Sequence, residues 1–210
     1  MTGRAREREL VAIYADESCL GNGREGENPG GAGALVEYRR SGSAVIARRD
    51  LWLSEPASTN NRMALRSVSA ALTELASKGA AFDVVFTTDS RYIVDGMTEW
   101  VHAWARQGWT RKSGAIENLA LWAAAIRAAG GHHVRWEWVR GHSGHAQNEY
   151  ANHLATRAAA DQTQSGGLVP SSFTAWNAAE RMNGDKHAAP AAFPSYATFR
   201  PHAALPDPPR

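Results

Sequence analysis

Two aspartates stand at the ends of predicted strands, where they are well placed for chemistry. Asp16 closes the apolar run ELVAIYAD, and Asp89 follows the run FDVVFTT. Sites in mixed sheets gather at the carboxyl ends of the central strands. A pair of carboxylates there could bind a hard divalent cation, whereas an isolated aspartate at a strand end is more often a turn residue.

The elements that must position these acids follow from the pattern of the chain. Runs at 9–16, 32–38 and 43–53 predict three successive antiparallel strands. Residues 58–79 predict a helix, because capping residues precede an apolar stripe and a Lys-Gly pair ends it. Two further predicted strands, each followed by helical sequence, complete the domain. This order indicates an α/β fold in which helices flank a mixed sheet.

Composition limits what the chain can be. With 210 residues, 43% of them hydrophobic, it can form one domain with a sizeable core and an additional segment. The formal net charge is only +2, so phosphate binding would require local clusters of basic residues. The single Cys19 excludes an intramolecular disulfide, and the N-terminal residues contain no apolar run long enough for a signal peptide or membrane span. We therefore expect a cytoplasmic protein without membrane contact.

The composition changes near residue 164. Seven of the nine prolines lie beyond this point, interspersed with Ala, Ser and Gly. We predict an N-terminal extension (1–8), a domain (9–162) and a Pro/Ala-rich, largely disordered tail (163–210). Within the tail, the stretch SSFTAWNAAERM (171–182) predicts a short amphipathic helix, which could dock Phe173 and Trp176 on the domain or on a partner.

Six segments, in order and spacing, resemble type 1 ribonuclease H: YADESCLGN, STNNRM, TTDSRYIVDGMTEWVHAW, GW, NLALW and WEWVRGHSGHAQNE. The resemblance covers residues 9 to about 160. It implies a ribonuclease H-like fold with a five-stranded mixed sheet of order 3-2-1-4-5. It also implies an endonuclease that cuts the RNA strand of RNA/DNA hybrids with two divalent ions, Mg²⁺ or Mn²⁺. We expect a monomer that has the hybrid as its partner.

The resemblance implies four carboxylates around those ions. Asp16 and Asp89 match two of them, but Ala64 stands where the family has Glu and Asn152 where it usually has Asp. Asparagine keeps a carbonyl oxygen that can bind a metal or its water, so the implied ligands are Asp16, Asp89 and Asn152. His142 matches a loop histidine that assists proton transfer or product release.

Another acid could replace the missing Glu. Glu17 stands where the family usually has Gly, but strand alternation predicts that its side chain points away from the face that Asp16 uses. We therefore expect Glu17 to repel a substrate phosphate and not to act as a ligand. The candidates that remain are Glu149 on the last predicted helix, and Glu25 and Glu27 in the long loop after the first strand.

Several residues match positions at which the family contacts the hybrid. Asn22, Thr59, Asn60 and Asn61 could reach 2′-hydroxyl groups and so sense RNA, or they could simply be polar loop and helix-capping residues. Arg91 stands where the family often has Gln. A basic, aromatic segment resembles the family's protrusion that grips the DNA strand, and its candidate residues are Trp100, Trp104, Arg106, Trp109, Arg111 and Lys112.

The sequence thus predicts a ribonuclease H that binds RNA/DNA hybrids and hydrolyses the RNA strand, with activity impaired by the lost carboxylates. The alternative is an inactive hybrid-binding protein on the same frame. A transposase or resolvase of the same general fold is disfavoured, because these proteins lack the TNNRM segment and the protrusion.

Overall fold

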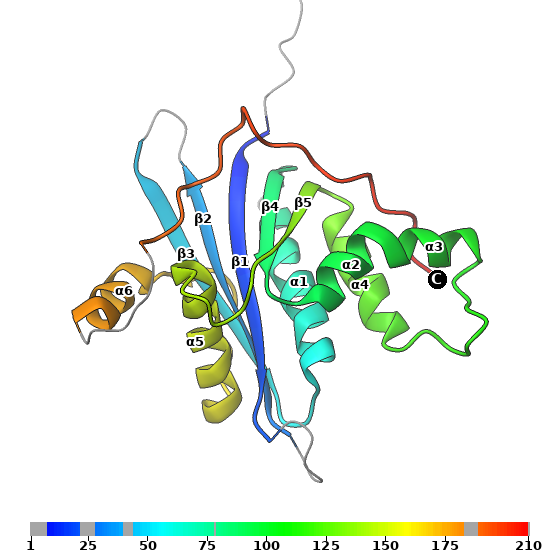
Figure 1. Ribbon diagram of the computed structural model, residues 1–210, viewed down its shortest axis with the longest axis horizontal. Helices are drawn as coiled ribbons and strands as arrows, with labels where there is room; N and C mark the ends of the chain where they lie inside the picture. The colour runs from blue at the N-terminus through cyan, green and yellow to red at the C-terminus, as the bar shows by residue number, and fades with distance from the viewer. Residues whose placement is uncertain (1–7, 22–27, 40–43, 78, 183–188, 210) are drawn as a thin grey trace, which may run out of the picture.

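A six-stranded mixed sheet forms the centre of the protein in the computed structural model, which describes residues 8–21, 28–39, 44–77, 79–182 and 189–209 (Figure 1). The strand order is β5-β4-β1-β2-β3-β6. Strand β1 pairs antiparallel with β2 and parallel with β4, and β4 pairs parallel with β5. The strands are β1 (Leu10–Cys19), β2 (Gly30–Arg39), β3 (Ile46–Glu55), β4 (Asp83–Thr88), β5 (His133–Trp138) and β6 (Val169–Pro170).

The first five strands have the order predicted from the sequence. The two-residue strand β6 was not predicted, and it pairs with Arg49 and Asp50 at the outer edge of β3. A two-residue strand carries no alternation that a sequence pattern could reveal. The fold is therefore the expected one, with one short strand added at its edge.

Helices cover both faces of the sheet and give each face its own core (Figure 1). Val11, Ile13 and Ala15 of β1 pack on the side of α1, whereas Ala12 and Tyr14 pack on the side of α5. None of the described helices has the length and apolar character of a membrane span. The helices are α1 (Asn60–Ala76), α2 (Arg91–Asp95), the π-helix η1 (Gly96–Trp100), α3 (Val101–Arg106), α4 (Leu119–Ala129), α5 (Ala146–Asp161) and α6 (Phe173–Met182).

A glycine of β2 lets α5 lie directly on the sheet beside Asp16. Gly33 is the partner of Asp16 in the β1–β2 register. A Cβ atom at Gly33 would overlap the backbone oxygen of Ala151 in α5. The close approach therefore requires glycine, and it brings the middle of α5 next to the end of β1 that carries Asp16.

The short helix expected near 171–182 is α6, which docks on its own domain. Phe173 is 1% exposed and packs against Tyr150 of α5. Asp50 of β3 fixes the start of the helix, because its Oδ2 accepts hydrogen bonds from the Tyr150 hydroxyl (2.6 Å) and from the Ser172 backbone N–H (3.0 Å). The carboxylate thus ties β3, α5 and α6 together.

Residues 189–209 differ from the expectation of a largely disordered tail. They form neither helix nor strand, but they cross the sheet from the side of α6 to β5 (Figure 1). Phe199 is 8% exposed in a cluster with Leu10 and Val85, and Phe193 packs beside it. The anchoring aromatic residues follow no helical or strand period, so composition alone suggested disorder.

Candidate active site

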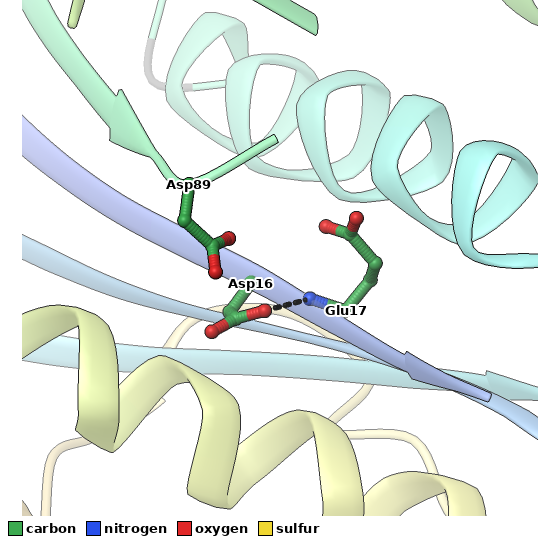
Figure 2. A group of neighbouring side chains, drawn as sticks. All are labelled: Asp16, Glu17 and Asp89. Carbon is green, nitrogen blue, oxygen red and sulfur yellow. Dashed lines mark hydrogen bonds between the residues drawn. The ribbon is translucent and has the colours of Figure 1, made fainter. Parts of the chain in front are cut away.

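Three carboxylates from two neighbouring strands meet at one end of the sheet. Asp16 and Glu17 lie on β1, Asp89 follows β4, and one oxygen from each lies within 4.8 Å of the others (Figure 2). The parallel pairing of β1 with β4 ends at Ala15 and Thr88, so β1 continues past the end of its neighbour. The three side chains converge in the space that this offset leaves.

The structure places Glu17 beside Asp16 and Asp89, although strand alternation predicted that its side chain would point away from them. Alternation does place Glu17 on the face of α1 and Asp16 on the face of α5, and Figure 2 shows the Glu17 carboxylate turned toward α1. Strand β4, however, ends at Thr88. Beyond that residue, β1 is not paired with β4, so β4 does not keep the two faces of the sheet apart there. Glu17 therefore reaches the group that it was expected to avoid. It lies on the side where Ala64, 1% exposed in α1, contributes no acid.

Crowding and burial favour the protonated forms of these acids. Burial, with the negative charges of Asp89 and Glu149, raises the pKa of Asp16 to about 8, against the hydrogen bond from the Glu17 backbone N–H (2.7 Å). Burial, Asp16 and Asp89 raise the pKa of Glu17 well above its usual value, opposed by a hydrogen bond with Ser90. Burial also raises the pKa of Asp89. A cation would offset this repulsion, so the donor set fits a hard divalent metal.

We expect Asp16→Asn to stabilise the metal-free protein at alkaline pH. The folded-state pKa of about 8 lies above the ordinary 3.8, so the unfolded chain loses this proton first as pH rises. Stability is thus lost between about pH 4 and 8, and asparagine removes that loss. At about 1.4 kcal/mol per pKa unit, the gain should be several kcal/mol, up to about 5 kcal/mol, at pH 8.5 and small at pH 4, measured by urea unfolding in a chelator.

The control for this prediction is Asp161→Asn, which removes an exposed acid of α5 that is paired with Arg157. It should show no pH-dependent gain. Added Mg²⁺ should shrink the advantage of Asp16→Asn, because a metal that binds the folded wild-type protein stabilises it. A loss of stability in Asp16→Asn at pH 8.5 would contradict the account of carboxylate repulsion.

The loop that carries His142 lies beside the carboxylates. A Cβ atom at Gly141 would overlap Asp89 Oδ2, so the backbone of this loop packs directly on the acid. Glu149 of α5 holds the loop, because its Oε1 accepts from Gly144 N–H (3.4 Å) and its Oε2 lies 3.7 Å from His142 Nδ1. His142 is 76% exposed. The imidazole is therefore near the acids and open to solvent.

Helix α5 is anchored next to Asp16 by a residue that sequence analysis did not identify. Asn148 is 1% exposed, and its Nδ2 donates to the backbone oxygen of Ala15 (3.3 Å). Asn152, one turn further, is half-buried, and its Oδ1 accepts a hydrogen bond from Thr156 Oγ1 (3.5 Å). Its assignment as a metal ligand stays a prediction. The signal in the sequence for the contact of Asn148 was weak, because it consisted of an asparagine in the first turn of a predicted helix, before its apolar stripe.

Thr59, Asn60 and Asn61 lie together at the start of α1. Thr59 is the N-cap, whose Oγ1 accepts from Arg62 N–H (3.4 Å), so its helix-capping role is realised. That role leaves open a second contact with nucleic acid. Asn22, Glu25 and Glu27 lie outside the described residues, so the structure does not test those predictions.

Trp138, an exposed aromatic residue, lies beside the acids, and Arg91 packs on its ring. The Arg91 guanidinium lies 3.9 Å from the centre of the Trp138 ring, and Trp138 Nε1 donates to the backbone oxygen of Asp89 (2.9 Å). Trp138 is 39% exposed at the end of β5. The pair thus presents a cation on a flat ring next to the carboxylates.

The predicted protrusion divides into an aromatic base and a basic rim. Trp100 and Trp104 pack against one another and against Trp122, and Trp100 also packs against Tyr92, so both stabilise the segment. Trp109 is half-buried with a left-handed backbone (φ 61°). Arg106, Arg111 and Lys112 are exposed. Their charges are therefore free to approach a phosphate backbone.

Fold and site together define a nucleic-acid hydrolase frame built on clustered carboxylates. The RNase H family model matches residues 8–160, and the chain belongs to this family. It is 41% identical over 157 residues to the ribonuclease H of Pectobacterium carotovorum, a match that covers 74% of this chain and 94% of that protein. It is 40% identical over 155 residues to the ribonuclease H of Klebsiella pneumoniae, covering 73% and 92%.

Solved structures are also similar to the chain. A crystal structure of LC9-RNase H1, described as a type 1 RNase H with the type 2 active-site motif, is 66% identical, has a TM-score of 0.90 and covers 95% of each chain. The PFV RNase H domain is 16% identical, has a TM-score of 0.60 and covers 75% of this chain and 99% of that one, a likeness of fold alone.

Proposed function

We propose that the protein is an active ribonuclease H in which Glu17 supplies the carboxylate that Ala64 lacks. The observation that carries this proposal is the convergence of Asp16, Glu17 and Asp89 within 4.8 Å. The similarity to a type 1 RNase H described as having the type 2 active-site motif supports it, because that protein is named RNase H although its active-site motif is that of another type. The sequence alone predicted an impaired activity. The proposal is instead that the activity is intact.

Asp16, Glu17 and Asp89 would hold divalent metal, with Asn152 as a further neutral donor. Mg²⁺ or Mn²⁺, two ions by the resemblance to the family, would supply water activation and stabilisation of the leaving oxygen. Residues around the acids orient the site. The Asn148 side chain fixes α5 on β1, and the backbone at Gly141 packs on Asp89. The raised carboxylate pKa values mean that binding a cation releases protons at neutral pH.

His142 is proposed to transfer a proton or assist release of the cleaved strand. It is exposed, next to the acids, and its loop is attached to α5 through Glu149. An exposed histidine side chain next to the acids can accept or donate a proton and can move between the site and solvent. The Glu149 carboxylate, 3.7 Å from His142 Nδ1, gives the imidazole a contact with α5.

An RNA/DNA hybrid is the proposed substrate, and three groups of residues would contact it. Thr59, Asn60 and Asn61 present hydroxyl and amide groups that can contact 2′-hydroxyls. Arg91, which packs on Trp138 beside the backbone of Asp89, could bind a phosphate near the cleaved bond. Arg106, Arg111 and Lys112 provide the charges for the DNA strand.

The deciding experiment is cleavage of a labelled RNA/DNA hybrid by the full chain in Mg²⁺ and in Mn²⁺. We expect the RNA strand to be cut internally and the same RNA in a duplex with RNA to be left intact. The alternative function, binding without cleavage, follows from the loss of two family carboxylates. Tight hybrid binding with no cleavage in either metal would establish that alternative.

Neutralising Arg111 and Lys112 should weaken the salt dependence of hybrid binding. Each phosphate contact contributes nearly one unit to the slope of log affinity against log salt, so the slope should flatten by about two units. Binding is measured by fluorescence anisotropy in a chelator between low and physiological salt. The control is Arg157→Gln with Arg181→Gln, which removes the same charge from α5 and α6; an equal flattening there would refute the assignment of the protrusion.

A further inference from the structure

A buried glutamine of α5 binds the C-terminal segment. Gln147 is 0% exposed, and both groups of its side-chain amide pair with one residue of the tail. Its Nε2 donates to the backbone oxygen of Ala191 (2.9 Å), and the Ala191 backbone N–H donates to its Oε1 (3.0 Å). The two bonds fix both the position and the direction of the chain at Ala191.

Gln147 lies in the first turn of α5, where the neighbouring residues serve the carboxylate site. Asn148, the next residue, is bonded to the backbone oxygen of Ala15, which precedes Asp16. Glu149 follows and holds the loop of His142. The first turn is thus attached to β1 and to the loop, and Gln147 attaches it to the tail.

The tail is itself held by further contacts beyond this attachment. Phe193 packs against the apolar cluster that contains Tyr14 and Ala146, and also against the cluster that contains Phe199. Farther on, Trp136 N–H donates to His202 Nδ1 (3.0 Å), so the segment is also tied to the edge strand β5. Ala191 is therefore a fixed point against which α5 can be positioned.

We propose that Gln147 is a positioning residue for the active site, and that the docked segment 189–205 works through it. The first N–H groups of a helix have no partners within the helix, so its first turn is easily displaced unless other contacts hold it. The contact with Ala191 holds this turn so that Glu149 keeps the His142 loop over the acids. This inference rests on the proposed ribonuclease activity, because its effect on catalysis presupposes it.

The experiment compares Gln147→Leu with Tyr150→Phe, both in the full chain. Tyr150→Phe also deletes a buried hydrogen bond of α5, but that bond joins Asp50 on the side of β3 and α6. We expect Gln147→Leu to lower kcat about tenfold, because small misplacements of catalytic groups are costly. Its KM for the hybrid should stay within about twofold. Tyr150→Phe should lower the melting temperature and leave kcat unchanged.

A second measurement separates the inference from the proposed activity. Hydrogen exchange at the amides of Asn148 and Glu149 should become about tenfold faster in Gln147→Leu, and not in Tyr150→Phe. If the wild-type protein cuts no hybrid, the proposed function fails, and the exchange result alone decides whether Gln147 positions the turn. Equal exchange in the two variants, or equal kcat in an active protein, would overturn the inference.

Discussion

Replacing Glu17 by glutamine should lower the rate of hybrid cleavage at least about a thousandfold, a loss of about 4 kcal/mol of transition-state stabilisation. Glu17 is one of three acids that meet within 4.8 Å, so losing its charge removes a third of the carboxylate charge there. Glutamine keeps the size of the side chain, so the fold should remain. Cleavage is measured under single-turnover conditions in saturating Mg²⁺.

Hybrid binding separates a metal defect from a general one. In a chelator, Glu17→Gln should bind the hybrid at least as well as the wild-type protein, because the exposed cations of the protrusion are unchanged. Glu74→Gln, which removes an acid from α1, should cut at the wild-type rate. Near-normal cleavage by Glu17→Gln would show that Glu17 is no ligand, and Glu149 would then be the described acid to test.

The fold could be predicted well from the sequence because its signals are periodic or local. The strand order 3-2-1-4-5 and the helix near 171–182 both appear in the structure. The edge strand β6 and the course of residues 189–209 could not be predicted, since they depend on single contacts such as Phe199 against Leu10. Such contacts form between residues that are distant in sequence and leave no period in it.

The site was predicted in part, and the unexpected closeness of Glu17 to Asp16 has a definite physical cause. Alternation correctly assigned Asp16 and Glu17 to opposite faces of the sheet, as the two cores of β1 show. It could not reveal that β4 ends at Thr88. Thr88 pairs with Ala15, so the next residue, Asp16, has no partner in β4. Faces are separate only where strands are paired on both sides, so the length of the neighbouring strand decided the outcome.

The roles of Gly141 and Asn148 also depend on tertiary contacts. Gly141 allows the His142 loop to pack on Asp89, and Asn148 bonds the strand that carries Asp16. In the sequence, one is a loop glycine and the other an asparagine at a helix start, both with common local explanations. What distinguishes them is the acid or strand that each one touches.

Moving the acid back to α1 should restore activity only when Glu17 is absent. In the Glu17→Gly background, adding Ala64→Glu should raise the cleavage rate at least about tenfold, because Ala64 of α1 lies in the core on the face of β1 from which Glu17 projects. Ala64→Glu alone should give no gain and should lower stability, because Ala64 is 1% exposed and the site already holds three acids.

The cleavage rates of these variants test whether a carboxylate at position 64 can replace that of Glu17. Thr73→Glu adds the same charge at an exposed position of α1, so in the Glu17→Gly background it should rescue nothing. A large gain from Ala64→Glu in the otherwise wild-type chain would mean that the native site lacks an acid and that Glu17 does not supply it. Rescue confined to the Glu17→Gly background would mean that the two carboxylates serve one metal position, reached from a strand in this protein instead of from a helix.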